Sequence, residues 1–220
     1  MNVRSEIEAA HAKRGRGRPL VDDKRRIILD AAIRVFGERG FHGTSVPDIA
    51  AAAGVGTGTL YRYFEHKEGL VNEVFRDAKL RLRAAMLDNA PALDPNDAAS
   101  SKRWFTELWR RLGGFAMTEP AAFRFLEMQD HVEYLDHESR ELELSLLGPL
   151  FFAGKQILDS KQAKKRGAAP PGARVDTLIA LLWGAFVGLV KASRLGYLVL
   201  DDEQIKLAGE AAWQLIATAR

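Results

Sequence analysis

The sequence predicts an all-α protein of about nine helices, and three observations lead to this prediction. Apolar side chains recur at helical spacing along most of the chain, as at Ile28, Ala32 and Phe36. No segment sustains the alternation of apolar and polar residues that is typical of a half-buried strand. Two short helical segments, 46–53 and 57–64, are joined only by a Gly-Val-Gly turn, which is the spacing of a helix-turn-helix.

The composition is that of a soluble globular protein with one large domain or two small ones. The chain has 220 residues, of which 47% are hydrophobic and 28% charged, and it has no cysteine. Disulfides, thiolate metal sites and cysteine nucleophiles are therefore excluded. The longest apolar run, 178–190, is shorter than the roughly 20 residues that cross a bilayer, and the charged first residues do not predict a signal peptide. We expect a cytoplasmic protein with no membrane partner.

Positive charge is concentrated in the N-terminal part of the chain. Residues 1–85 carry 16 Lys and Arg against 11 Asp and Glu, whereas residues 86–220 carry 16 against 18. A basic part beside a slightly acidic remainder favours a polyanionic partner for the first part alone. Many solvated surfaces are mildly basic, so the charge balance by itself has little weight.

Residues 1–21 lack helical periodicity and are basic, and we expect them to form a flexible arm. Within this arm, Arg16 and Arg18 flank a glycine and are followed by Pro19. This order resembles the core of an AT-hook, whose extended arginines lie in a narrow A·T minor groove. The alternative is a solubilising tail that does not contact DNA.

The residue pattern in 22–68 predicts three helices separated by two short turns. We expect Asp22 or Asp23 to cap the first helix, and Gly40 is placed to end it in a left-handed cap. Ser45 and Asp48 have the spacing of a capping box, and Pro47 lies in the first turn of the second helix. The third helix follows the glycine-bearing turn.

Beyond this segment the pattern stays helical. We expect helices at 67–89, 100–118, 120–136, 138–166, 174–196 and 202–219. A break at 91–96 and a proline-containing loop at 167–172 interrupt the series. The chain is therefore predicted to be helical to its end.

The residues from Ile49 to Phe64, IAAAAGVGTGTLYRYF, followed by KEGL at 67–70, resemble the DNA-binding signature of the TetR family. The resemblance extends over 22–70. The sequence departs from the family at Gly56, where a serine commonly caps the recognition helix, and at His42, where an aromatic residue is frequent. The first departure bears on one expected phosphate contact, and the second on packing.

The resemblance implies a TetR-like architecture in two domains. A three-helix DNA-binding domain would span 22–68, after the arm at 1–21. A helical domain for ligand binding and dimerisation would span 69–220. The helix that contains 178–190 is apolar on every face and, with the last helix, suits a four-helix dimer bundle.

The resemblance makes 57–64 the recognition helix, which enters the major groove of DNA. Its first turn has the short polar groups that suit phosphates and base edges, while Leu60, Phe64 and Ala50 are expected in the core. The predicted DNA contacts are Arg16, Arg18, Thr44, Ser45, Thr57, Gly58, Thr59, Tyr61, Tyr63 and Lys67. Alternatively, the threonines of the third helix are only helix caps.

Aromatic and methionine side chains gather in the middle helices, where they suit a pocket for an apolar ligand. The candidate ligand-binding residues are Trp104, Trp109, Phe115, Phe123, Met128, Phe152 and Trp183. Such side chains more often form plain core. Gly184 and Gly188, four residues apart, would let two helices approach closely, although packing within one chain explains them nearly as well.

The function implied by the resemblance is that of a homodimeric repressor, which binds a palindromic operator in double-stranded DNA and is released by a small-molecule effector. A DNA-binding regulator controlled by a protein partner is one alternative, and a helical enzyme or carrier is another. The sequence lacks a phosphate-binding glycine loop and a nucleophile elbow, so we predict no enzyme and no cofactor. Glu127 and His131 lie one turn apart, but we expect a polar helix surface there rather than a metal site.

Overall fold

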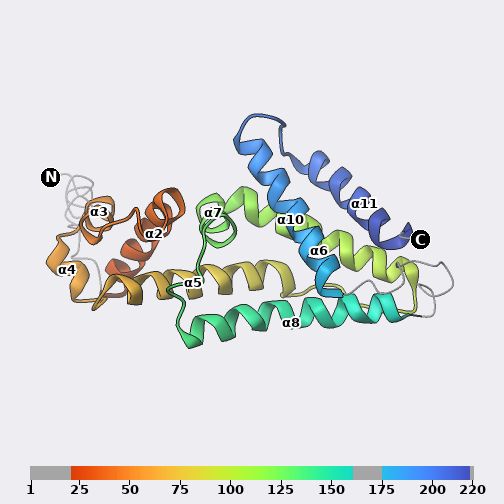
Figure 1. The fold of residues 1–220 in the computed structure, drawn as a ribbon, viewed down its shortest axis with the longest axis horizontal. Coiled ribbons are helices and arrows are strands. Elements are labelled where there is room, and N and C mark those ends of the chain that lie inside the picture. The colour runs from red at the N-terminus through yellow and green to blue at the C-terminus, as the bar shows by residue number, and fades with distance from the viewer. Residues whose placement is uncertain (1–20, 161–174, 219–220) are drawn as a thin grey trace, which may run out of the picture.

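The computed structural model describes residues 21–160 and 175–218, and this part of the chain is entirely helices and connecting turns. Its nine helices are α2 (Val21–Arg39), α3 (Val46–Ala52), α4 (Thr57–Tyr61), α5 (Lys67–Leu87), α6 (Ala98–Thr118), α7 (Pro120–Met128), α8 (His137–Asp159), α10 (Val175–Arg194) and α11 (Asp202–Thr218). Helices α2, α3 and α4 form a small module at one end of the molecule, and the others form a larger body (Figure 1). The predicted all-α fold is confirmed.

Local signals in the sequence set the boundaries of the first helices. Gly40 has a φ of 70° and donates its N–H to the carbonyl of Phe36 at 2.8 Å, which ends α2. Ser45 and Asp48 form a reciprocal capping box at the start of α3. Gly54, with a φ of 65°, makes the turn toward α4. These three predictions are confirmed, whereas neither Asp22 nor Asp23 caps α2, because the helix already includes Val21 and both aspartates lie inside it.

Two helices end three or more residues before their predicted ends. Helix α4 ends at Tyr61 instead of Phe64, and α7 ends at Met128 instead of residue 136. In the second case Gln129 is extended, with φ −117° and ψ 151°, and Asp136 caps the next helix. Residues 129–136, which apolar periodicity assigned to the helix of α7, are therefore a connecting segment, and α8 begins close to the predicted start at 138. The predicted end of α8, residue 166, lies outside the described residues.

Helix α5 connects the module to the body (Figure 1). It packs against α2 in the module and against α6, α7 and α8 in the body, while α2 also packs directly on α7. One cluster of buried apolar side chains extends from Ile28 in α2 through Phe75 and Leu82 in α5 to Phe186 in α10. Module and body thus share a continuous core.

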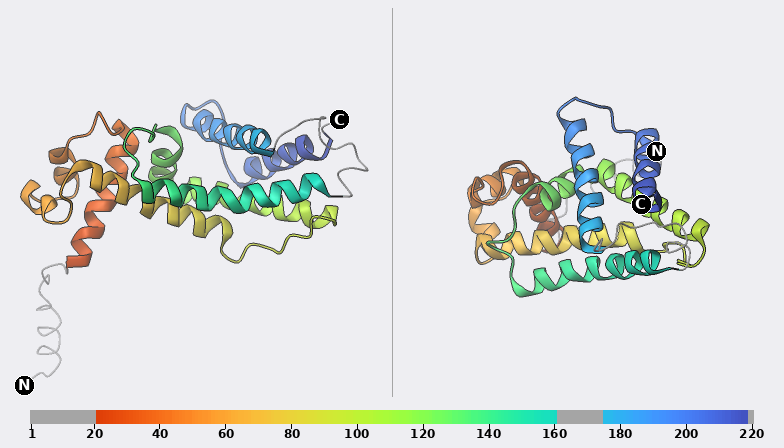
Figure 2. Two further views of the ribbon diagram at one scale, coloured as in Figure 1. Left: turned by 60° about the horizontal axis from the view of Figure 1, so that its bottom comes forward. Right: turned by 45° about the vertical axis from the view of Figure 1, so that its right-hand side comes forward.

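Helices α10 and α11 lie on the same side of the body (Figures 1 and 2). Helix α10 has 20 residues and is long and apolar enough, by length and composition, to cross a membrane. The helix is longer than the run 178–190 that the sequence criterion considered, because Val175–Thr177 and Lys191–Arg194 extend it at both ends. Only 11% of its most apolar window is buried. A helix that is apolar all round needs a cover on its exposed side.

Candidate nucleic-acid interface

Helix α4 lies at the end of the molecule and is anchored through one of its faces (Figure 1). Leu60 is 1% exposed and Phe64, just after the helix, is 3% exposed. Ala50 of α3 is also buried, so the three predicted core positions are confirmed. Gly58 and Tyr61, by contrast, are exposed. The anchoring therefore presents the other face of α4 to a partner.

The first turn of α4 is narrow and has no hydroxyl cap. Gly56 is the N-cap, with extended φ and ψ of −72° and 147°, and no side chain forms a capping hydrogen bond there. Thr57 and Thr59 are half-buried, and a Cβ added at Gly58 would meet nothing within 4 Å. The turn can thus approach another surface closely.

The two tyrosines after Thr59 differ in their surroundings. The side chain of Tyr61 is 48% exposed, whereas Tyr63 packs against the core with its ring centroid 6.5 Å from that of Phe64. Lys67, the first residue of α5, places its ammonium 4.0 Å from the ring centroid of Phe41, which is a cation–π contact. Tyr61 is the freest of these three side chains to contact a partner.

The hydroxyls of two predicted DNA-contacting residues, Thr44 and Ser45, already donate hydrogen bonds within the protein. Thr44 is 3% exposed, and its hydroxyl donates to the carbonyl of Gly40 at 2.7 Å. The predicted phosphate contact of this side chain does not fit its position, because the hydroxyl closes the loop after α2. Ser45 is exposed, but its hydroxyl donates to Asp48 at 2.6 Å within the capping box. Arg16 and Arg18 lie outside the described residues.

Sequence reasoning missed two residues of this region, His66 and Phe41. His66 is the N-cap of α5, where its Nδ1 accepts the N–H of Gly69 at 2.8 Å. Histidine is not among the preferred N-cap residues, so the sequence offered little signal for this role. The ring of Phe41 forms the cation–π contact with the ammonium of Lys67, and only the folded chain brings these two residues together.

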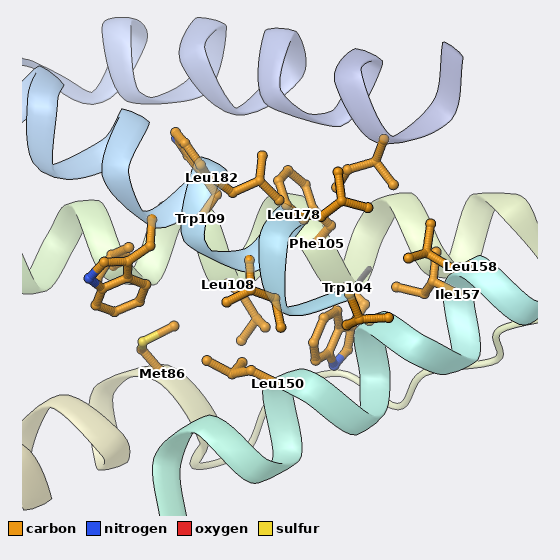
Figure 3. A pocket seen from close by; sticks show the side chains of 16 residues that line it. Met86, Trp104, Phe105, Leu108, Trp109, Leu150, Ile157, Leu158, Leu178 and Leu182 are labelled. Carbon is orange, nitrogen blue, oxygen red and sulfur yellow. The ribbon is translucent and has the colours of Figure 1, made fainter. Parts of the chain in front are cut away.

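The body contains an apolar cavity of about 120 Å³ between α5, α6, α8, α10 and α11 (Figure 3). Its lining residues are Met86, Trp104, Phe105, Leu108, Trp109, Leu112, Leu150, Gly154, Ile157, Leu158, Val175, Leu178, Ile179, Leu182, Trp183 and Ile216. None of these side chains is charged. The cavity therefore suits an apolar group.

Three of the seven candidate ligand residues, Trp104, Trp109 and Trp183, line this cavity. The other four are Phe115, Phe123, Met128 and Phe152, and they do not. Phe123 packs edge-on against Phe186, which in turn packs edge-on against Trp109. Phe152 is 64% exposed. Composition indicated the helices that surround the cavity, but the rotation of each helix decided which rings line it.

A buried charged cluster lies behind the cavity wall. Glu127 accepts the indole N–H of Trp183 at 2.6 Å, and its second oxygen is buried without a hydrogen bond, 3.8 Å from the ammonium of Lys79. That ammonium also lies 3.4 Å from Glu143. Burial raises the pKa of Glu127, while Lys79 and the indole lower it. The expectation of a polar helix surface here was wrong.

His131, the other residue of that expectation, is also largely enclosed. Its Nε2 donates to the carbonyl of Phe125 at 2.7 Å, and its Nδ1 accepts from the hydroxyl of Tyr134 at 2.5 Å. Burial lowers its pKa. Among the residues that the structure describes, no group of three or more His, Asp or Glu is arranged to hold a metal ion.

Two family models match the chain. Bacterial regulatory proteins of the tetR family match residues 28–74, which contain α3 and α4. The tetracyclin repressor-like C-terminal domain matches residues 87–218, which is more than half of the chain. The chain belongs to the TetR family of transcriptional regulators.

Individual relatives agree with this assignment. The HTH-type transcriptional regulator BetI of Klebsiella pneumoniae (strain 342) is 38% identical over 79 residues, and the match covers 36% of this chain and 40% of BetI. A TetR family transcription regulator from Marinobacter aquaeolei VT8 has 27% identity and a TM-score of 0.72, covering 90% of this chain and 97% of that one. A putative regulator from Vibrio parahaemolyticus has 29% identity and a TM-score of 0.62, covering 88% and 98%.

Membership of the TetR family makes this protein a DNA-binding transcriptional regulator and not an enzyme. The family predicted from the signature in α3 and α4 is therefore confirmed, together with its N-terminal helix-turn-helix and C-terminal helical domain. The match to BetI spans only about two fifths of that relative's length.

Proposed function

We propose that this TetR family regulator is a homodimeric repressor, which binds a palindromic operator and leaves it when a small apolar ligand fills the cavity of the body. The observation that carries the proposal is the pairing of a partly exposed helix α4 with an apolar cavity in one molecule whose core is continuous. In such a repressor, residues 1–21 would be the arm, 22–68 the DNA-binding domain and 69–220 the ligand domain. As a DNA-bound regulator it would act in the cytoplasm.

On DNA, α4 would enter the major groove with its first turn leading. Thr57, Gly58 and Thr59 would approach base edges and phosphates, because a Cβ at Gly58 would meet nothing within 4 Å among the described residues. Tyr61 and Lys67 would reach phosphates, with Tyr63 and Ser45 at the margin of the contact. Two such helices in a dimer would occupy successive major grooves roughly 34–36 Å apart.

The dimer would form through α10 and α11. Gly184 and Gly188 lie on the exposed side of α10, and a Cβ at either position would meet nothing within 4 Å. Packing within the described chain therefore gives no reason for these glycines, whereas a second copy of α10 would. Leu207 and Leu215 add exposed apolar surface on α11. A protein partner suits α10 better than lipid, because Phe186 on its other side is buried in the core.

Release of the operator requires a ligand that binds the DNA-incompetent state more tightly than the DNA-bound state. Helix α7 offers a structural link, because Glu127 in α7 holds the cavity residue Trp183 while α7 packs on α2. A ligand that displaces Trp183 would thus act on the helix that supports the DNA-binding module. The alternative, a regulator controlled by a protein partner, has support in the exposed apolar side chains Phe151 and Phe152 of α8.

Selection of bound sequences from random duplex DNA tests the proposal. We expect a palindromic site whose half-sites are about one helical turn apart. Adding small apolar compounds to the complex then separates the two regulatory schemes. Release by a compound that a Leu178→Trp variant no longer binds would support the cavity as the effector site. Failure to enrich any sequence would overturn the proposed repressor.

A further inference from the structure

The segment between α7 and α8, residues 129–136, crosses α5 and reaches the loop that follows α2 (Figure 1). Gln129 donates its side-chain N–H to the carbonyl of Gly37 at 3.2 Å. At the other end Asp136 donates its backbone N–H to Asn72 of α5 at 2.9 Å. The segment therefore connects the ligand domain to the DNA-binding module. The proposed repressor mechanism gives this connection no role.

Tyr134, within this segment, is held at both its backbone and its hydroxyl. Its carbonyl accepts the side-chain N–H of Asn72 at 2.7 Å. Its hydroxyl donates to Nδ1 of His131 at 2.5 Å, because Nε2 of that ring already donates to the Phe125 carbonyl. The ring of Tyr134 consequently has a fixed position relative to the body.

The ring of Tyr134 stacks on Phe41 of the module, with centroids 4.4 Å apart and planes 27° apart. The ammonium of Lys67 lies 4.0 Å from the centroid of the same Phe41 ring. A ring stacked at that distance fills one face of Phe41, so the ammonium occupies the other face. Tyr134, Phe41 and Lys67 thus form a layered contact from the ligand domain to the edge of the DNA-binding module.

We propose that Tyr134 is a positioning residue for DNA binding, which holds the Lys67 ammonium toward the DNA backbone through the Phe41 ring. The inference rests on the proposed contact of Lys67 with a phosphate. A lysine side chain loses much rotational freedom when it binds one phosphate. Tyr134 and Phe41 already restrict the Lys67 side chain before DNA binds, because its ammonium is attracted to a Phe41 ring that Tyr134 holds in place. Less rotational freedom is then lost when the ammonium binds a phosphate.

A double-mutant cycle with a salt titration tests the inference. Duplex affinity is measured for wild type, Lys67→Met, Tyr134→Leu and the double variant over a range of salt concentrations. We expect Lys67→Met to lower affinity about tenfold and to reduce the slope of log K against log salt by about 0.9, the effect of one lost phosphate contact. Tyr134→Leu should reduce both quantities in the wild-type background and neither in the Lys67→Met background.

Two further variants separate positioning from folding. Tyr134→Phe keeps the stacked ring and should retain the wild-type salt slope, whereas Phe41→Leu should behave like Tyr134→Leu. Tyr197→Leu is the matched control, because that tyrosine is 79% exposed and outside the layered contact. If Tyr134→Leu does not fold, the cycle is run with Phe41→Leu in its place. Equal losses of affinity from Phe41→Leu in the wild-type and Lys67→Met backgrounds would likewise overturn the inference.

The outcomes distinguish the inference from the function on which it rests. Equal losses from Tyr134→Leu in both backgrounds would overturn the positioning role and leave the phosphate contact of Lys67 standing. Unchanged affinity and salt slope in Lys67→Met would overturn that contact and the inference with it. Sequence-specific binding by α4 would survive either result.

Discussion

Identical residue types in this regulator do different things because their neighbours differ. Tyr61 and Tyr63 are two positions apart in one motif, yet the first is 48% exposed and the second packs on the core. Thr44 and Thr57 both looked like phosphate ligands, but the hydroxyl of Thr44 closes the loop to Gly40. A side chain can contact DNA only where the fold leaves its polar atom free.

Tyr61→Ala is the most direct test of the DNA-contacting face. The side chain is half-exposed, so its removal should leave the thermal stability nearly unchanged. Operator affinity should fall about tenfold, which is the size of one charge-assisted hydrogen bond. Fluorescence anisotropy with a labelled operator measures the effect. Tyr197→Ala is the control, and equal affinities for the two variants would contradict a Tyr61 contact.

Glu127 predicts a particular pH dependence of stability. Burial raises the pKa of its carboxyl above the ordinary value of 4.5, so above that pH the native state retains a proton that the unfolded chain has lost. Stability contributed by this residue therefore falls as pH rises from 4.5 through the raised pKa. Glu127→Gln keeps an acceptor for Trp183 and removes the titration.

Chemical unfolding of both proteins between pH 4 and pH 8 checks this prediction. The free energy of unfolding of the wild type, relative to Glu127→Gln, should decline with rising pH. The other carboxylates titrate in both proteins, so their contribution cancels in the difference between the two free energies of unfolding. Parallel profiles would show that Lys79 compensates the buried charge fully.

At the scale of elements, close approach between α6 and α11 depends on two glycines. A Cβ at Gly209 of α11 would come within 2.8 Å of the Trp109 ring in α6. A Cβ at Gly113 of α6 would come within 2.7 Å of Ile205 in α11. Each glycine therefore accommodates a large side chain of the facing helix, and the cavity residue Trp109 keeps its place because of one of them.

Gly209→Ala should destabilise the protein even though alanine favours a helix. The added methyl would press on an indole that is 6% exposed and held between neighbouring rings, at a cost of about 1–3 kcal/mol. Gly114→Ala is the matched control, because nothing lies within 4 Å of its Cβ and the helix should gain about 0.5–1 kcal/mol. Opposite shifts of the urea midpoint are expected. A stabilised Gly209→Ala would contradict the close packing.

For the molecule as a whole, the proposed dimer depends on the exposed side of α10. The exposed side of α10 is open at Gly188, so a larger side chain there would not disturb the single chain. Gly188→Glu would instead place an unpaired charge in the proposed dimer interface. Light scattering should give a molar mass of twice 24.4 kDa for the wild type and of 24.4 kDa for Gly188→Glu.

Leu144→Glu is the control for that experiment. Leu144 is 66% exposed on α8, which has no part in the proposed dimer, so this variant should remain dimeric. Operator affinity should fall only in the monomeric variant, because a single α4 would read one half-site. A Gly188→Glu protein that stays dimeric would exclude α10 from the interface.

Deletion of residues 1–20 tests the basic arm. If Arg16 and Arg18 enter the minor groove, the truncated protein should bind the operator more weakly and with a flatter dependence on salt, by about 0.9 in slope for each lost phosphate contact. Titration of the operator at several salt concentrations gives both values. An unchanged slope would favour the solubilising tail.

Patterns in the sequence were enough to predict the family, the all-α class, the end of α2 and the starts of α3 and α4. These depend on local chemistry, such as the capping box at Ser45 and the left-handed glycine at Gly40, and such signals need only a few neighbouring residues. The tertiary structure decided the rest. Which tryptophans line the cavity, that Glu127 is buried, and that Tyr134 meets Phe41 all depend on residues brought together from distant helices. Helical periodicity identifies the face of a helix, but not the partner that the face will meet.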